Sequence, residues 1–248
     1  MLRRRRRGWR KPSHREEYVY GYQARDLLVS DSIMPAKLLA VFLLVGTALL
    51  GAGSVMHPVL TGAGVGSADL RVIAATSGWR LMHLSMLTGS ALVMTGVWVR
   101  LGGASEDART ALVGALAVIC IGMTLNAFDI LLMARSGGRM AAMFVAGRTE
   151  MAPIFDAVHG FGLMAARFGN LLIALGALVL GIVEWREPAQ PRWLAWLAWI
   201  AAVGGLVGVL CFDESSRLVL GAVALLCAWE VATALRVLVG RTGSAGAR

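Results

Sequence analysis

Residues 155–184 read FDAVHGFGLMAARFGNLLIALGALVLGIVE, an apolar run long enough to cross a lipid bilayer as one helix. A transmembrane helix needs about 20 residues to cover roughly 30 Å of hydrocarbon. Polar side chains gather in the first part of this run, at Asp156, His159, Arg167 and Asn170. Because ionisable groups are costly in lipid unless they are paired, wetted or liganded, the same stretch indicates both the fold class and a candidate site.

Five further runs of the same character accompany it, and the chain as a whole is apolar. Of its 248 residues, 57% are hydrophobic, and the mean hydropathy is +0.68. Soluble domains contain about 45–50% apolar residues. In lipid, the backbone N–H and C=O groups of a spanning segment have to be paired within that segment, which requires a helix. The sequence therefore predicts an all-α integral membrane protein, a bundle of six transmembrane helices at 35–56, 79–100, 110–134, 155–184, 192–212 and 217–239.

Basic residues lie mainly beside these spans. Lys and Arg number 24 against 15 Asp and Glu, and five consecutive arginines, Arg3–Arg7, stand near the start. Most of the basic residues fall on the side of the N-terminus, which predicts an N-in, C-in orientation in the inner (plasma) membrane. We expect a basic cytoplasmic segment at 1–33, with a short helix on the membrane surface, a membrane domain at 34–240 and a cytoplasmic tail at 241–248. The arginine run suits anionic lipid, so nucleic acid is not an expected partner.

Polar and small residues recur at helical spacing along three of the predicted spans. A helical projection places them on one stripe per span. The stripes are His83, Met86, Leu87, Ser90 and Met94 on the second span, Gly122, Asn126, Asp129 and Met133 on the third, and His159, Gly162, Ala166, Asn170 and Ile173 on the fourth. Since a polar stripe facing lipid would cost several kcal/mol, we expect the three faces to turn toward one another.

Four ionisable groups then fall in one layer near the non-cytoplasmic face: His83, Asp129, Asp156 and His159. Two imidazoles from two helices can hold the iron of a haem b, so His83 and His159 are candidate ligands. Asp129 and Asp156 would orient their rings. The same layer, together with His57, is a candidate copper site, since five methionines lie near this face and thioethers suit Cu(I). They are Met82, Met86, Met140, Met143 and Met151.

Two other functions remain open at this point. In the first, the polar groups only join helices, with Asp129 paired to Arg80 or Arg167, and the protein is a non-catalytic accessory subunit among other membrane subunits without any cofactor. In the second, polar groups within the spans line a transport or proton pathway. That pocket would use Asn126, Arg167, Asn170 and Glu230. No motif in the sequence assigns an enzymatic activity.

The connections on the non-cytoplasmic side are the longest in the chain. They run from His57 to Gly78 and from Arg135 to Pro153. We expect both to be loops, and long ordered loops often carry binding sites.

Overall fold

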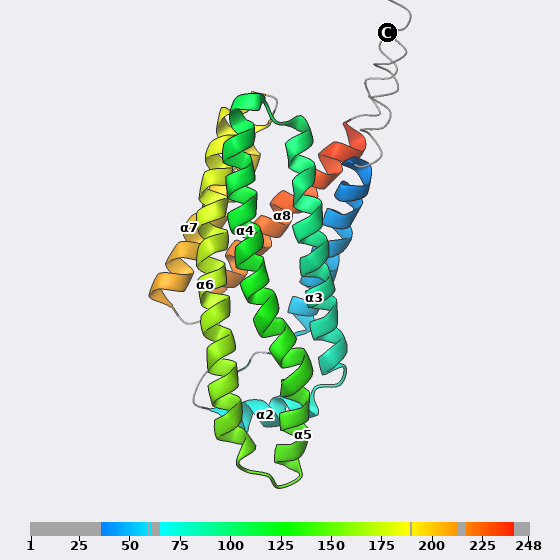
Figure 1. The fold of residues 1–248 in the computed structure, drawn as a ribbon, viewed down its shortest axis with the longest axis vertical. Helices are drawn as coiled ribbons and strands as arrows, with labels where there is room; N and C mark the ends of the chain where they lie inside the picture. The colour runs from blue at the N-terminus through cyan, green and yellow to red at the C-terminus, as the bar shows by residue number, and fades with distance from the viewer. Residues whose placement is uncertain (1–35, 59, 61–64, 189, 213–216, 241–248) are drawn as a thin grey trace, which may run out of the picture.

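The computed structural model describes residues 36–58, 60, 65–188, 190–212 and 217–240. Within these residues the regular structure is helical, and six helices are long and apolar enough to span a membrane (Figure 1). Their bounds are Ala36–Met56, Trp79–Gly102, Glu106–Val145, Met151–Arg186, Arg192–Cys211 and Leu218–Val239. The prediction of an all-α chain with six long apolar helices is confirmed. The predicted segments 1–33 and 241–248 lie outside the described residues.

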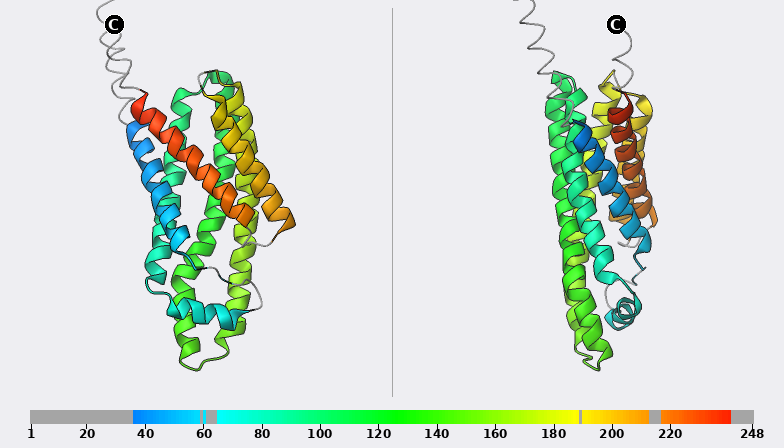
Figure 2. Two further views of the ribbon diagram at one scale, coloured as in Figure 1. Left: turned by 180° about the vertical axis from the view of Figure 1, so that it is seen from behind. Right: turned by 90° about the vertical axis from the view of Figure 1, so that its right-hand side faces the viewer.

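The elements follow one another with few interruptions. The first spanning helix, Ala36–Met56, precedes a short helix that lies across one end of the bundle (Figure 1). The labelled elements are α2 (Gly66–Ala75), α3 (Trp79–Gly96), the 3-10 segment η1 (Val97–Gly103), α4 (Glu106–Leu132), the π-helical segment η2 (Met133–Gly137), α5 (Gly138–Val145), α6 (Met151–Arg186), α7 (Arg192–Cys211) and α8 (Arg217–Val239). Figure 2 shows α8 crossing the bundle obliquely.

Both long connections contain helix, so the prediction of loops there was wrong. Between His57 and Gly78 the chain forms α2, which buries Asp69, Leu70 and Ile73 at helical spacing. Between Arg135 and Pro153 the α4 helix continues through η2 and α5 as far as Val145. We call the part of the bundle formed by α2 and α5 the α2–α5 end. The described chain starts and finishes at the opposite end (Figures 1 and 2).

Glycines allow α4 and α6 to approach each other closely. A Cβ built on Gly122 of α4 would lie 2.5 Å from the carbonyl oxygen of Gly169 on α6, and one on Gly169 would lie 2.5 Å from the carbonyl oxygen of Gly122. The two backbones therefore touch directly, as they do in membrane helix pairs with small residues at the interface. The first spanning helix meets α3 in the same way at Gly46 and Gly89.

Polar contacts join the elements at the end opposite α2 and α5. The Arg100 guanidinium in η1 donates to Glu184 of α6 through Nε (2.7 Å to Oε1) and Nη2 (3.1 Å to Oε2). Beside this pair, Ser105 precedes α4 and donates its backbone N–H and its hydroxyl to Glu187 Oε2, each at 3.0 Å. The exposed N-terminal N–H groups of a helix need such acceptors, so Glu187 caps α4.

Candidate functional site

A second hydrophobic cluster, separate from the main core, fills the α2–α5 end and is rich in methionine. Its buried members are Leu70, Ile73, Trp79, Met82, Met133, Met140, Ala141, Met151 and Phe155. Met86 and Met143 pack against it as partly buried members. We call the six thioether side chains the methionine cluster. All five methionines that the sequence placed near this face belong to it, and Met133 joins them.

Three aromatic rings stack beside this cluster, two of them imidazoles. The ring centroids of Trp79 and His83 are 4.2 Å apart, those of His57 and His83 are 5.0 Å apart, and those of His57 and Trp79 are 5.3 Å apart. His57 follows the first spanning helix, and Trp79 opens α3 one turn before His83. The structure therefore joins the end of the first helix to the start of α3 through these rings.

The hydrogen bonds of the two imidazoles fix their tautomers. Nδ1 of His57 lies 2.7 Å from the carbonyl oxygen of Pro58, and Nδ1 of His83 lies 2.8 Å from the carbonyl oxygen of Trp79. A carbonyl oxygen can only accept, so both Nδ1 atoms carry the proton and both Nε2 atoms keep a lone pair. Burial lowers the pKa of His57 below its ordinary value of 6.5, which the hydrogen bond to Pro58 only partly offsets.

Trp79 also holds the irregular segment of the long third span. Its indole N–H donates to the carbonyl oxygen of Met133 at 2.9 Å. Met133 is the first residue of η2, where the helix widens to the π form and its backbone hydrogen bonds shift. Trp79 thus gives a carbonyl of this irregular segment a donor from another helix. This bond fixes Met133 inside the methionine cluster.

His159 of α6 borders the same cluster from the opposite side. It is 6% exposed, and its ring lies 5.0 Å from the ring of Phe155, a member of the cluster. Asp156, between them in sequence, places its carboxyl group against the start of α2, because a Cβ on Gly66 would lie 2.8 Å from Asp156 Oδ1. A carboxylate at a helix N-terminus is stabilised by the helix dipole.

The predicted stripes of α4 and α6 do face each other. Asp129 of α4 packs its Oδ1 against Gly162, three residues after His159. Nearer the middle of the bundle, Asn126 donates through Nδ2 to Asn170 Oδ1 at 3.2 Å. Asp129 Oδ1 is buried and accepts no hydrogen bond from the described part of the chain. The contact between α4 and α6 is thus polar at Asp129 and at Asn126, and it continues through Gly122, Gly169 and Gly176, where the two helices pack closely.

One expectation for this region needs correction. The stripe of α3 does not turn wholly toward α4 and α6, because Met86 packs on Gly53 of the first helix, and the His83 ring meets that of His57. Arg167 donates to the carbonyl oxygen of Val209 from Nε (3.0 Å) and Nη2 (2.7 Å), and so caps the C-terminal turn of α7.

Glu230 lies away from the other residues of the predicted polar pocket. It faces the first spanning helix, where Thr47 Oγ1 is 2.7 Å from Glu230 Oε2. The other three lie elsewhere: Asn126 and Asn170 meet between α4 and α6, and Arg167 of α6 reaches Val209 of α7. The structure therefore divides the four predicted residues between two places.

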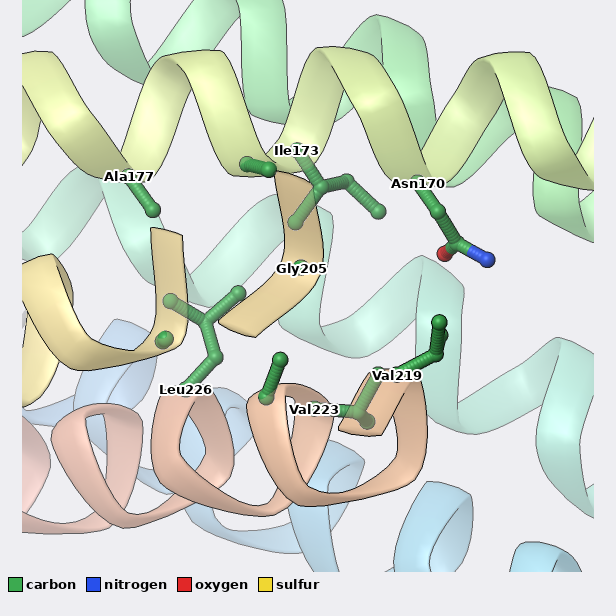
Figure 3. A pocket seen from close by; sticks show the side chains of 10 residues that line it. Asn170, Ile173, Ala177, Gly205, Val219, Val223 and Leu226 are labelled. Carbon is green, nitrogen blue, oxygen red and sulfur yellow. The ribbon is translucent and has the colours of Figure 1, made fainter. Parts of the chain in front are cut away.

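A cleft of about 290 Å³ of empty space, part of it open to the surroundings, lies between α6, α7 and α8 (Figure 3). Asn170 stands at one end of it, and the other lining residues are apolar. They are Ile173, Ala174, Ala177, Ala201, Gly205, Val219, Ala222, Val223 and Leu226. Such a lining suits apolar chains and offers no charge to a polar substrate.

Some of the candidate metal ligands lie close together in the structure and others do not. Within the described ranges, no group of three or more His, Cys, Asp or Glu side chains is placed to hold a metal ion. The predicted set of His57, His83, Asp129, Asp156 and His159 is thus not gathered around one point. Two sets of donors do come together, the imidazoles of His57 and His83 and the thioethers of the methionine cluster. Trp79 contacts both imidazoles and belongs to the cluster.

Sequence reasoning missed one residue that shapes this region and an ion pair at the opposite end of the bundle. Trp79 was not singled out, although it lies four residues before His83 and so on the same helix face. The Arg100–Glu184 pair was also missed, because the two residues are 84 positions apart and each stands at the end of a span.

Comparison with known proteins finds no match: no protein-family profile fits the chain, and no curated protein and no solved structure is significantly similar to it. Function has to be inferred from the residues themselves.

Proposed function

We propose that this polytopic membrane protein binds Cu(I) at the α2–α5 end, through the imidazoles of His57 and His83 and thioethers of the methionine cluster. One observation carries the proposal: six methionines, far apart in sequence, gather in the interior beside two imidazoles whose Nε2 atoms are unprotonated. Soft thioether ligands select Cu(I), and imidazole is a common copper ligand.

The donor set fits this ion in charge and in distance. Thioethers and neutral imidazoles carry no charge and cannot neutralise a bound cation. Because buried charge is costly, such a ligand set favours a monovalent ion over a divalent one. Metal–nitrogen bonds of about 2 Å require two ligating rings to have centroids within about 6.5 Å of each other. The centroids of His57 and His83 are 5.0 Å apart. The backbone carbonyls on Nδ1 would keep both rings oriented.

The position of the site in the membrane follows from the charge pattern. We infer an N-in, C-in orientation in the plasma membrane from the excess of Lys and Arg on the N-terminal side. The α2–α5 end would then face the non-cytoplasmic side. A Cu(I) site there suits a protein that takes up, passes on or uses copper at the outer surface, alone or within a membrane redox complex.

Copper binding is tested with the purified, reduced protein and a chromogenic Cu(I) chelator as competitor. We expect one Cu(I) per chain, and an X-ray absorption spectrum with both nitrogen and sulfur neighbours. His83→Ala and Met82→Leu should each weaken binding by more than about tenfold, the loss typical even of residues that only support a ligand. Met164→Leu is the matched control, because Met164 is 63% exposed and lies outside the cluster.

Haem b is the second candidate, favoured by one observation. His83 and His159 are both buried, and each is one helical turn from a member of the same cluster, Trp79 and Phe155 respectively. A haem would give a Soret band that sharpens on reduction and disappears in both His83→Ala and His159→Ala. A protein that holds neither copper nor haem, and purifies with other membrane subunits, would instead be an accessory subunit.

A further inference from the structure

The carboxyl group of Glu230 lies within the membrane-spanning part of α8 and is 4% exposed. Within the described residues its polar partner is the hydroxyl of Thr47 on the first spanning helix, at 2.7 Å. Thr47 Oγ1 also lies 2.7 Å from the carbonyl oxygen of Leu43, one turn earlier on its own helix. Three oxygens thus form a chain from Leu43 through Thr47 to Glu230.

The number of protons in this chain follows from the chemistry of its members. A hydroxyl has one hydrogen to donate, and a backbone carbonyl can only accept. If Thr47 donates to Leu43, the short contact with Glu230 needs a second hydrogen, and only the carboxyl group can supply it. Both contacts are hydrogen bonds at once only when Glu230 is a neutral carboxylic acid. Burial without a cation also disfavours the carboxylate.

Two further polar groups beside Glu230 have no partner within the described residues. They are the Trp229 indole N–H and the Thr233 hydroxyl, on residues that are 1% and 4% exposed. Thr233 follows Glu230 by three residues and Trp229 by four, so the Thr233 side chain is a neighbour of each of them on α8. Buried donors of this kind usually bind an ordered water or a ligand.

The buried Thr233 hydroxyl lacks a bond that four other threonines, in or directly after helices, do make. The hydroxyls of Thr47, Thr76, Thr95 and Thr124 each donate to the carbonyl four residues earlier, at 2.7–2.9 Å. This is the usual way to satisfy a threonine in a membrane helix. Thr233 makes no such bond, so its hydroxyl remains available to a molecule beside Glu230.

The elements around Glu230 carry several charged or titratable side chains. The first helix brings Lys37, ten residues before Thr47 and so about 15 Å along the axis. The α7 helix carries Arg192 and Cys211 at its two ends, and Arg100 of η1 is bonded to Glu184. On α8 itself Cys227 is the near titratable group, and Arg236 lies almost two turns away. No cation among these replaces the proton.

We propose that Thr47, Glu230 and Thr233 form an intramembrane site that takes up and releases one proton through a bound water molecule. On release, the O–H bond of the Glu230 carboxyl breaks, and the proton passes to the water, which Thr233 and Trp229 hold. The Thr47 hydroxyl then rotates from Leu43 to donate to the carboxylate that remains. On uptake the steps reverse. The site is independent of the copper ligands, and it adds a proton-coupled step to the protein.

Infrared spectroscopy of the full chain in lipid vesicles tests this site directly. At neutral pH, Glu230→Gln should remove a carbonyl band of a protonated carboxylic acid, and transfer to D₂O should shift that band in the wild type. Thr47→Val, which keeps the shape but removes the hydroxyl, should move the same band to higher frequency. Glu150→Gln is the matched control: Glu150 is exposed, so this variant should lose a carboxylate band instead.

Each other outcome would overturn the proposal. A carboxylate band lost from Glu230→Gln at neutral pH would show that the group is ionised. A protonated band that never shifts in D₂O would show that the proton does not exchange. Disappearance of the band on adding Na⁺ at constant pH would show that the site holds a metal cation. If Glu230→Gln fails to fold, the Thr47→Val shift and the D₂O exchange of the wild type decide the question.

Discussion

Arg100 and Glu184 form a two-point ion pair that is almost completely removed from solvent, at 4% and 0% exposure. The pair joins η1 to α6 at the end of the bundle opposite the candidate copper site. Each charge is tolerated only because the other is there, since an isolated charge in such surroundings carries a large desolvation cost.

Removing one charge of this pair should destabilise the protein strongly. We expect Glu184→Gln, which leaves the Arg100 guanidinium buried and unpaired, to lower the free energy of unfolding by about 3–5 kcal/mol. The double variant Arg100→Met/Glu184→Met should recover most of the loss, because two apolar side chains can replace a buried pair. Unfolding of the detergent-solubilised protein, followed by circular dichroism, measures both.

The chain offers a matched pair for comparison. Arg148 Nε and Glu150 Oε1 are also 2.7 Å apart, but the two side chains are 57% and 52% exposed. Glu150→Gln should therefore leave stability unchanged, as is usual for surface ion pairs. Equal effects of Glu184→Gln and Glu150→Gln would contradict the assignment of the buried pair.

The contact between Gly122 and Gly169 predicts opposite effects for two similar substitutions on α6. Gly169→Ala would place a Cβ 2.5 Å from the Gly122 carbonyl oxygen, so α4 and α6 must separate, at about 1–3 kcal/mol. Gly160→Ala meets nothing within 4 Å and should be neutral or stabilising by up to about 1 kcal/mol, since alanine favours the helix. Thermal unfolding of the two variants in one detergent checks the sign of each.

Hydropathy alone was enough to predict the spans, because lipid requires long apolar helices and nothing in the chain competes with that demand. The wheel argument also placed Asp129, Gly162 and Asn170 on the correct inner faces. It could not predict that His83 would meet His57, because their contact depends on how the chain returns through α2.

The irregular parts of the α2–α5 end were not predictable for a related reason. A π-helical turn such as η2 shifts the register by one residue, and its first carbonyl accepts a hydrogen bond from Trp79, 54 residues away in the sequence, rather than from a local partner that a pattern would reveal. Likewise α2 is short and only moderately apolar, so its Gly-rich surroundings read as a loop. Periodicity predicts faces of long helices, whereas contacts between segments decide the rest.

Trp79→Phe removes the indole hydrogen bond to Met133 and should lower the free energy of unfolding. The ring contacts are largely retained, but the Met133 carbonyl loses the indole donor in a region where water cannot easily replace it, at a cost of about 1–3 kcal/mol. Hydrogen–deuterium exchange should rise in η2 and α5 more than in α7. Trp193→Phe, at a 48% exposed position, is the control and should change neither quantity. Unchanged exchange in Trp79→Phe would mean that η2 does not depend on this bond.

The burial of His57 predicts how the stability of the metal-free protein depends on pH. Burial lowers the pKa of this imidazole below 6.5, so the folded state binds fewer protons than the unfolded state when the pH falls below that value. The contribution of His57 is therefore complete above pH 6.5 and is lost progressively as the pH falls, at no more than about 1.4 kcal/mol per pH unit. His57→Gln keeps a polar side chain without a titrating group, so the difference in unfolding free energy between wild type and variant should shrink toward acid pH.

The measurement is made with a copper chelator present, because bound metal would itself compete with protons at Nε2. A difference that stays constant between pH 7.5 and about 5 would show that the imidazole remains in contact with water and does not pack against Trp79 and His83.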